Sequence, residues 1–256
     1  MDIITSKQNP RIKYAKTLQT KARLRRSEMK LILEGNRLIK DALQRSARPD
    51  YVLYTPDRAD YDIIATLQNR KCELLAVSDE ILNYVSDTQQ AQGIIGIFFI
   101  PKPNLPQDPQ RIVVMDNIRE PGNMGTILRT TAAAGVDLVI LSPGCVDPYN
   151  SKVLRSGMGA HYQVPIVEAT WKEIENFCVD IAIYSATVDG EVRYNDVDWT
   201  QPSAFIIGNE AHGISKNARN ISKSSISIPM ANNTESLNAA IATAVILFEA
   251  QRQRLG

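Results

Sequence analysis

Short apolar runs alternate with helix-like segments after residue 111, and this alternation is the feature that most restricts the fold of the chain. The expected strands span residues 111–116, 137–142, 163–167, 181–187, 203–208 and 225–230, and the expected helices span 123–135, 151–160, 170–178 and 236–254. Runs that are apolar throughout are typical of strands buried on both faces, and strands joined through helices pair in parallel. The pattern predicts an α/β domain whose mostly parallel sheet has helices on both faces.

A proline-rich segment separates this domain from a smaller one. Residues 101–110 (PKPNLPQDPQ) contain four prolines and no apolar periodicity, which is typical of an extended, semi-rigid linker. Before it, strands are expected at 51–55, 72–78 and 93–100, and helices at 26–44, 60–70 and 78–87, the first with a possible turn at Gly35. We therefore expect an α/β domain over residues 1–100, a linker over 101–110 and the larger domain over 111–256.

Composition excludes several classes of protein. Of the 256 residues 44% are apolar, enough for a core, but no uninterrupted apolar stretch reaches the roughly 18–20 residues of a membrane span. Three scattered cysteines, and a first segment (MDIITSKQNPRIK) without an apolar signal core, favour a reduced, cytoplasmic protein. With only two histidines and no metal-ligand spacing, we expect no metal centre.

Positive charge is concentrated near the N-terminus. Residues 7–48 carry thirteen Lys/Arg and three Asp/Glu, a surplus of ten positive charges, whereas residues 111–256 carry twelve Lys/Arg and fifteen Asp/Glu. Such a surplus is typical of a surface that binds a polyanion, although a solvated helix face would show the same pattern. The candidate nucleic-acid contacts, from the stretch KTLQTKARLRRSEMKLILEG, are Arg23, Arg25, Arg26 and Lys30.

Three polar loops follow expected strands of the larger domain. They read NIREPGNMG (117–125), GNEAHGIS (208–215) and PMANNTES (229–236). Ligands of open α/β sheets bind outside the carboxyl ends of strands, so these loops are expected to form the site. The first loop lacks the triple-glycine spacing of a dinucleotide site and the lysine of a P-loop, which argues against both classes. Asn, Ser, Glu and backbone groups suit an uncharged or zwitterionic ligand better than a triphosphate.

These three loops, in this order, carry a family resemblance. With their flanking residues they read DNIREPGNMGTILRTTAAAG, FIIGNEAHGIS and SIPMANNTESLNAAIATAVILFEAQRQR. They resemble the three motifs of the SpoU/TrmH-type RNA 2′-O-ribose methyltransferases of the SPOUT superfamily, and the resemblance covers nearly all of residues 111–256. The basic N-terminal module resembles the substrate-binding domain of many members, which is similar to a ribosomal-protein RNA-binding fold.

The resemblance implies a fold, a cofactor and partners. It implies a trefoil-knotted larger domain, S-adenosylmethionine as the cofactor, RNA as the substrate and a homodimer as the assembly. Ribosomal RNA is the favoured substrate, because the added domain resembles those of ribosomal-RNA enzymes, and transfer RNA is the second candidate. Two further functions stay open: a non-catalytic RNA-binding protein that keeps the fold, and an enzyme that methylates a base.

The resemblance also assigns residues by their place in the motifs. The implied catalytic residues are Asn123, Arg129, Glu210, Ser236 and Asn238, and the implied cofactor-binding residues are Gly208, Ile228, Met230 and Leu237. Plain structural roles remain open for three of them: Asn123 as a helix cap, Arg129 as an ion-pair partner of Glu120 or Glu210, and Ser236 as an N-cap. Asn232 stands where family members often have glycine, and asparagine tolerates positive φ, so we expect the loop to keep its shape.

The implied reaction is attack of a ribose 2′-oxygen on the methyl group of the cofactor. The protein must position both groups and assist loss of the hydroxyl proton. The family proposal makes Arg129 the base, but a guanidinium stays protonated, with a pKa above about 12. Arg129 is better suited to orient a neighbouring phosphate and to stabilise charge on oxygen, with proton loss to phosphate or water.

Overall fold

The computed structural model describes residues 3–232 and 234–256, and its contacts divide the chain into two units. The N-terminal unit comprises Met1–Lys102 together with Tyr149–Tyr162, and the C-terminal unit comprises Pro103–Pro148 together with Gln163–Gly256. The first division falls inside the expected linker 101–110, which contains no helix or strand. The segment 149–162, expected in the larger domain, instead packs with the N-terminal unit.

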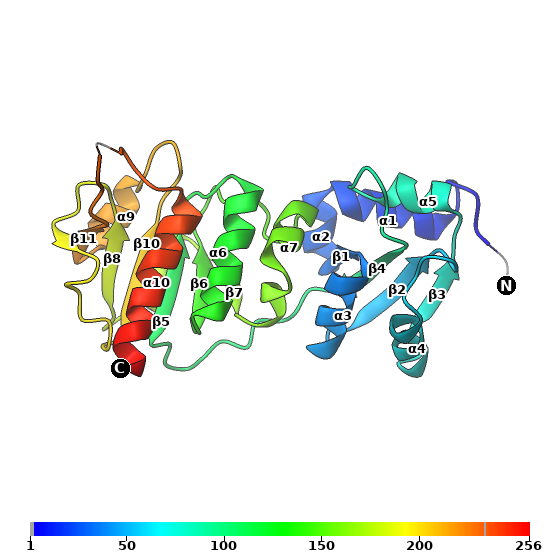
Figure 1. Cartoon of the computed structure of the whole chain (residues 1–256), viewed down its shortest axis with the longest axis horizontal. Helices are drawn as coiled ribbons and strands as arrows, with labels where there is room; N and C mark the ends of the chain where they lie inside the picture. The colour runs from blue at the N-terminus through cyan, green and yellow to red at the C-terminus, as the bar shows by residue number, and fades with distance from the viewer. Residues whose placement is uncertain (1–2, 233) are drawn as a thin grey trace. The chain divides into compact units, whose positions relative to one another are not determined.

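The N-terminal unit is a four-stranded sheet covered on both faces (Figure 1). Its strands, in the order β1-β4-β2-β3, are β1 (Lys30–Glu34), β4 (Ile94–Phe99), β2 (Pro49–Tyr54) and β3 (Glu73–Ala76). Its helices are α1 (Pro10–Thr20), α2 (Ala22–Glu28), α3 (Asn36–Gln44), α4 (Tyr61–Asn69), α5 (Asp79–Val85) and α7 (Ser151–Gly157), followed by a 3-10 turn, η1 (Ala160–Tyr162). Strand β4 is antiparallel to β1 and β2, whereas β2 and β3 pair in parallel.

The helix expected over residues 26–44 is interrupted by strand β1, so this expectation is wrong for Lys30–Glu34. Leu31 and Leu33 belong to one buried cluster of the sheet and Ile32 to the other. Side chains that alternate between two apolar clusters have the period of a strand, so the unbroken apolar run reflects burial on both faces and not a helix face. The turn expected at Gly35 is present, because Gly35 has φ 95° and helix α3 begins at the next residue.

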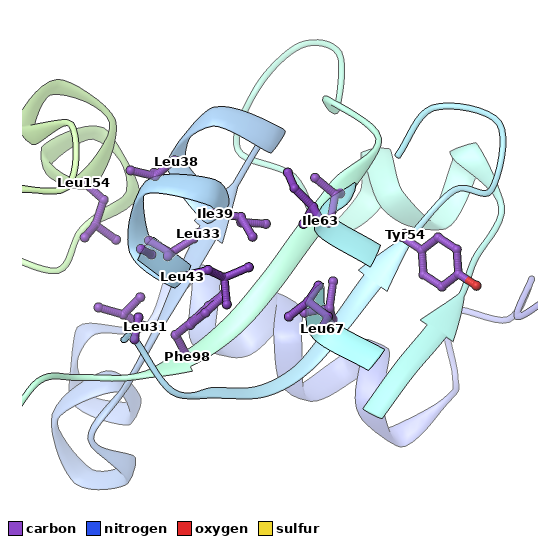
Figure 2. Close-up of a cluster of buried hydrophobic side chains, with 14 of the residues drawn as sticks. Leu31, Leu33, Leu38, Ile39, Leu43, Tyr54, Ile63, Leu67, Phe98 and Leu154 are labelled. Carbon is purple, nitrogen blue, oxygen red and sulfur yellow. The ribbon is translucent and has the colours of Figure 1, made fainter. Parts of the chain in front are cut away.

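Helix α7 completes the core on one face of this sheet (Figure 2). Its Leu154 is buried in the cluster that contains Leu31 and Leu38. At the edge of the contact, Asp87 Oδ2 accepts hydrogen bonds from Ser151 Oγ at 2.7 Å and Arg155 Nη2 at 3.2 Å. Burial raises the pKa of Asp87, but these hydrogen bonds outweigh burial and hold the pKa below its ordinary value. Helix α7 is therefore a structural element of the N-terminal unit.

The C-terminal unit contains a seven-stranded sheet in which each pairing between described strands is parallel, so the predicted sheet type is confirmed. Its order β7-β6-β5-β10-β8-β11-β9 joins β7 (Ile166–Glu168), β6 (Leu138–Leu141), β5 (Arg111–Met115), β10 (Ser203–Ile207), β8 (Ala182–Ala186), β11 (Ser224–Ser227) and β9 (Val192–Arg193). The helices are α6 (Pro121–Ala133), α8 (Trp171–Phe177), α9 (Lys216–Ile221) and α10 (Ala239–Leu255).

Helices cover both faces of this sheet, as predicted. On one face Ile112 and Ile206 share a buried cluster with Ile174 of α8 and Ala218 of α9. On the other, α6 and α10 lie side by side (Figure 1). The sequence pattern does not predict strand β9 and helix α9, because two residues and six residues are too short to give a periodic signal. No helix in the described part of the chain has the length and hydropathy that crossing a membrane requires.

We predict that Leu154→Ala destabilises the N-terminal unit although residue 154 lies in sequence between the first and the second motif of the larger domain. Removing a buried leucine side chain typically lowers the free energy of unfolding by about 2–5 kcal/mol. Hydrogen exchange over Leu31–Leu33, measured by mass spectrometry on the intact chain, should accelerate accordingly. The matched control is Gln68→Ala on the exposed face of α4, which should leave exchange unchanged. Equal exchange in both variants would show that α7 does not support β1.

Candidate functional site

A pocket of about 440 Å³ opens at the carboxyl ends of β8, β10 and β11. It is built entirely within the C-terminal unit, from the loops after these strands and the first turns of α10. The sequence-predicted residues that line it are Gly208, Glu210, Ile228, Met230, Ser236, Leu237 and Asn238. Asn123 and Arg129 lie on α6, outside the pocket lining. Of the three loops expected to form the site, the second (208–215) and the third (229–236) therefore supply lining residues of one cavity, whereas the first (117–125) lies outside the lining.

A buried carboxylate, that of Asp116, ties together the segments that follow β5, β6 and β10. Asp116 follows β5, and its Oδ2 accepts a 2.6 Å hydrogen bond from the backbone N–H of Ser215. Its Oδ1 accepts a 3.4 Å hydrogen bond from Ser142 Oγ at the end of β6. Ser215 is also the N-cap of α9, because its Oγ accepts from the backbone of Ala218. Sequence reasoning missed Asp116, although an acid that directly ends an apolar strand was a visible signal.

Asn209 shapes the turn that carries Glu210. The backbones of Asn209 and Gly213 exchange two hydrogen bonds, of 3.0 and 2.8 Å. The buried Asn209 side chain donates to the Asn117 carbonyl at 2.8 Å and accepts from the backbone N–H groups of Ala211 and His212 at 2.9 and 3.1 Å. One amide thus fixes the turn internally and ties it to the loop after β5.

Gly208 is required by the packing of this turn. A Cβ atom at residue 208 would overlap the Gly213 carbonyl group and would lie 2.7 Å from the backbone nitrogen of Ile214. The family resemblance assigns Gly208 to cofactor binding, for which the lack of a side chain would allow close approach to the backbone. The structure gives a different reason, which is close approach of the chain to itself, and places Gly208 in the pocket wall as well.

Asn123 links the first motif to the other two. Its Nδ2 donates to Glu210 Oε1 at 2.6 Å, and its Oδ1 accepts from Asn238 Nδ2 at 2.9 Å. The Asn238 Oδ1 in turn accepts from the backbone N–H groups of Ala240 and Ile241 at 2.9 and 3.4 Å. A continuous chain of hydrogen bonds therefore runs from Glu210 through Asn123 to the N-terminus of α10.

The structure excludes the helix-capping roles that were considered for Asn123 and Ser236. Helix α6 is capped by Glu120, whose carboxylate accepts from the Gly122 N–H at 3.3 Å, so Asn123 lies inside the first turn and is not the cap. Helix α10 is capped by Asn238, so the interpretation of Ser236 as its N-cap is wrong. Ser236 is exposed and lines the pocket instead.

Arg129 is exposed on α6, about 1.7 turns beyond Asn123. Within residues 3–232 and 234–256 its side chain forms no hydrogen bond or ion pair, so the pairing considered with Glu120 or Glu210 is absent from the described structure. A guanidinium left open to solvent can bind an external anion such as a phosphate.

The remaining walls of the pocket come from residues that sequence reasoning missed or left in doubt. Residues 186–189 line it beside β8, and the same strand-end rule that found the other loops would have found them. Asn232 has φ 55°, which confirms that asparagine replaces glycine in the left-handed region here. Three carboxylates, of Asp189, Glu210 and Glu235, and one guanidinium, of Arg219, lie in the lining. No group of three potential metal ligands was found among the described residues.

The predicted nucleic-acid contacts separate into two kinds. Arg23 and Arg26 are exposed on α2. Arg25 is only 4% exposed, and its Nη1 donates to the Leu18 and Gln19 carbonyls at 2.7 and 3.0 Å, so it closes the end of α1 and the prediction that it contacts a ligand is corrected. Lys30 pairs with Asp50 at 2.8 Å. Burial lowers the pKa of Lys30, but the hydrogen bond and charge of Asp50 outweigh it and raise the pKa above its ordinary value.

Comparison with known proteins gives one consistent result. The pattern of the SpoU rRNA Methylase family matches residues 110–248, and that of the MRM3-like substrate binding domain matches residues 9–96. The chain is 33% identical to "rRNA methyltransferase 3, mitochondrial" of Mus musculus, over 95% of this chain and 72% of that protein. It is 28% identical to the 23S rRNA (guanosine(2553)-2'-O)-methyltransferase RlmP of Bacillus subtilis, over 97% and 98% of the two chains. The structure of an AdoMet-bound rRNA methyltransferase from Sinorhizobium meliloti superposes with a TM-score of 0.87 at 29% identity, over 100% of this chain and 99% of that one.

We predict that Gly208→Ala opens the 209–213 turn, because the added Cβ overlaps the Gly213 carbonyl group. The Asn209 and Gly213 amides should then exchange faster with solvent, as measured by hydrogen exchange. The control is Gly122→Ala in α6, where the new Cβ meets only Glu120 Oε1 at 3.4 Å and alanine favours the helix by roughly 0.5–1 kcal/mol. Protection of the turn that survives Gly208→Ala would contradict this role of the glycine.

Proposed function

The chain belongs to the SpoU rRNA Methylase family, and on this basis we propose that it transfers the methyl group of S-adenosylmethionine to a ribose 2′-hydroxyl of RNA. Ribosomal RNA is the favoured substrate, in keeping with the names of the relatives from mouse and Bacillus subtilis. The observation that carries the proposal is the hydrogen-bonded chain Glu210–Asn123–Asn238, which joins all three motifs at the edge of the pocket.

The pocket suits S-adenosylmethionine in size and in chemistry. Its volume of about 440 Å³ lies within the usual range of small-molecule sites. Apolar side chains of Ile228, Leu237 and Ile246 provide a wall for the adenine ring. The carboxylates of Asp189, Glu210 and Glu235 face the same space and complement the sulfonium and ammonium charges. When bound, the cofactor supplies a methyl group that its sulfonium already activates.

The residues of the chain then have separate tasks in the reaction. Asn123 holds Glu210 and the start of α10 in fixed positions, which keeps the pocket walls in register. The exposed guanidinium of Arg129 is suited to bind a phosphate next to the target ribose through its planar fork. It would also stabilise negative charge on the attacking oxygen, while phosphate or water takes the proton.

We propose a homodimer formed through α6 and α10. Ile241 and Phe248 of α10 are 54% and 49% exposed and lie seven residues apart on one face of the helix. Arg129 is exposed on α6, which lies beside α10 (Figure 1). A second copy that covers this face would bury the apolar side chains and place Arg129 at the interface, where it could complete a site that the single subunit leaves open.

Two further properties rest on family membership and composition. We propose a trefoil knot in the C-terminal unit because the chain belongs to the SpoU rRNA Methylase family. A reducing compartment such as the cytoplasm is proposed because Cys72, Cys145 and Cys178 are free thiols.

We predict that Arg129→Ala abolishes methyl transfer while leaving cofactor affinity within about threefold, since Arg129 lies outside the pocket lining. Loss of one group that stabilises developing charge typically lowers the rate by roughly 100-fold or more. Arg129→Lys should also fail, because an ammonium lacks the planar fork. The assay follows nuclease-resistant, 2′-O-methylated dinucleotides in digested product RNA, and titration calorimetry with S-adenosylhomocysteine reports the affinity, near one site per subunit.

The control for this experiment is Arg193→Ala, an exposed arginine of β9 that does not line the pocket, which should keep wild-type activity. Full activity in Arg129→Ala would assign Arg129 to the surface and remove it from the mechanism. Absence of 2′-O-methylated product from the wild-type protein, together with methylated bases, would support base methylation instead.

We predict that Phe248→Glu, with or without Ile241→Glu, converts the dimer to a monomer. A charged side chain placed in an apolar interface loses its hydration without gaining a partner, so association is disfavoured. Size-exclusion chromatography with light scattering should give the mass of two chains for the wild type and of one chain for the variant. Val179→Glu, a change at an apolar residue that is exposed away from α10, is the control. A monomeric wild-type protein would reject the proposed assembly.

A further inference from the structure

Tyr84 lies on the surface of the N-terminal unit among lysines. Helices α1 and α5 lie side by side over one face of the sheet (Figure 1), and bury Ile12 and Leu18 from α1 and Leu82 from α5. Tyr84 is at the outer side of α5, where 36% of its surface is exposed. No hydrogen bond of its hydroxyl group is found within the described part of the chain.

Two ammonium groups converge on this one ring. Lys7 Nζ lies 5.5 Å and Lys16 Nζ 5.3 Å from the centroid of the Tyr84 ring. A single carboxylate, of Glu80, pairs directly with Lys7 at 2.6 Å. The charge of Lys16 also acts on Asp87, whose Oδ2 accepts hydrogen bonds from Ser151 and Arg155 of α7. Two ammonium groups and one directly paired carboxylate therefore surround a partly exposed aromatic ring.

This arrangement suits an unpaired nucleotide, whose base can stack on the Tyr84 ring while its phosphates pair with the lysines. Stacking of a nucleobase on an exposed aromatic ring contributes more to binding than one cation over such a ring. The lysine side chains are long and flexible, so they can leave the ring for the phosphates on either side of a stacked base. Bases in a duplex have both faces covered, and so the ring selects single-stranded or looped RNA.

We propose that Tyr84 is a stacking platform for an unpaired nucleotide of the RNA substrate, with Lys7 and Lys16 binding the adjacent phosphates. This inference rests on the proposed function, since it takes RNA as the substrate. It adds the class of RNA structure that the N-terminal unit recognises and the residues that recognise it. Tyr61, which is 83% exposed, is a second exposed aromatic residue among the described residues of this unit. No lysine or arginine was found over its ring within the described residues, so it provides a matched control.

The test measures binding of a fluorescently labelled, unstructured RNA oligonucleotide to the full chain by anisotropy. Tyr84→Ala should weaken binding by about 5- to 100-fold, the range for loss of one stacked base, and Tyr84→Phe should bind within about twofold of wild type because the ring is kept. Tyr84→Leu keeps apolar volume but not the aromatic face, and should weaken binding as Tyr84→Ala does. Tyr61→Ala should bind as wild type.

Charge and RNA structure give two independent readouts. Lys16→Gln should lower the slope of log affinity against log salt by about 0.7, as expected for one phosphate contact on a single strand. A duplex of the same sequence should bind with little dependence on Tyr84. Unchanged single-strand affinity in Tyr84→Ala, or equal losses in Tyr84→Ala and Tyr61→Ala, would overturn the platform.

The outcomes also separate this inference from the proposed function. Methyl transfer and binding of S-adenosylhomocysteine by the wild-type protein test the function, whereas the Tyr84 series tests the platform. An active wild-type enzyme whose RNA affinity ignores Tyr84 would reject the platform alone. A wild-type protein that transfers no methyl group to RNA but still binds single strands through Tyr84 would reject the function alone.

Discussion

The site depends on one buried carboxylate, that of Asp116. A buried charge is tolerated only when hydrogen bonds replace its lost hydration, and here the Ser215 N–H and the Ser142 hydroxyl do so. These bonds hold the chain that follows β10 against the ends of β5 and β6. Once that chain is held, Asn209 can reach the Asn117 carbonyl, and Glu210 is presented to Asn123. The hydrogen bonds of Asp116 and Asn209 thus hold in place the segment that carries Glu210 into the pocket wall.

Much of the C-terminal unit could be predicted because parallel strands impose a common direction. Apolar runs separated by helices place every strand end on one edge, so the loops with Glu210, Ser236 and Leu237 were expected to converge, and they line one pocket. The links between them could not be predicted. Asn123 bonds to residues 87 and 115 positions away, and no local pattern encodes such a partner. The same holds for Gly208, whose need arises from Gly213 and Ile214.

The N-terminal unit shows where sequence patterns mislead. The run Leu31–Leu33 has no period because both faces of β1 are buried, and propensity then cannot separate strand from helix. The surplus of positive charge in residues 7–48 is similarly ambiguous, because a basic residue can serve the fold or a ligand. Arg25 counts toward the basic surplus, yet its guanidinium satisfies the carbonyls at the end of α1. The family resemblance places RNA recognition in this unit, but only burial and pairing reveal which cations remain for a phosphate.

The path of the chain joins the two units more closely than the expected division at residues 101–110 implies. The segment 149–162 leaves the C-terminal unit after β6 and returns before β7, and in between it supplies Leu154 to the N-terminal core. A cut in the proline-rich linker would separate Leu154 from Leu31 and Leu38 and expose apolar surface on both fragments. The C-terminal fragment would keep the residues that line the pocket, because these residues belong to the C-terminal unit. The RNA recognition and the methyl transfer that we propose thus rest on different units, but because α7 belongs by contact to one and by sequence to the other, neither unit is a self-contained stretch of the chain.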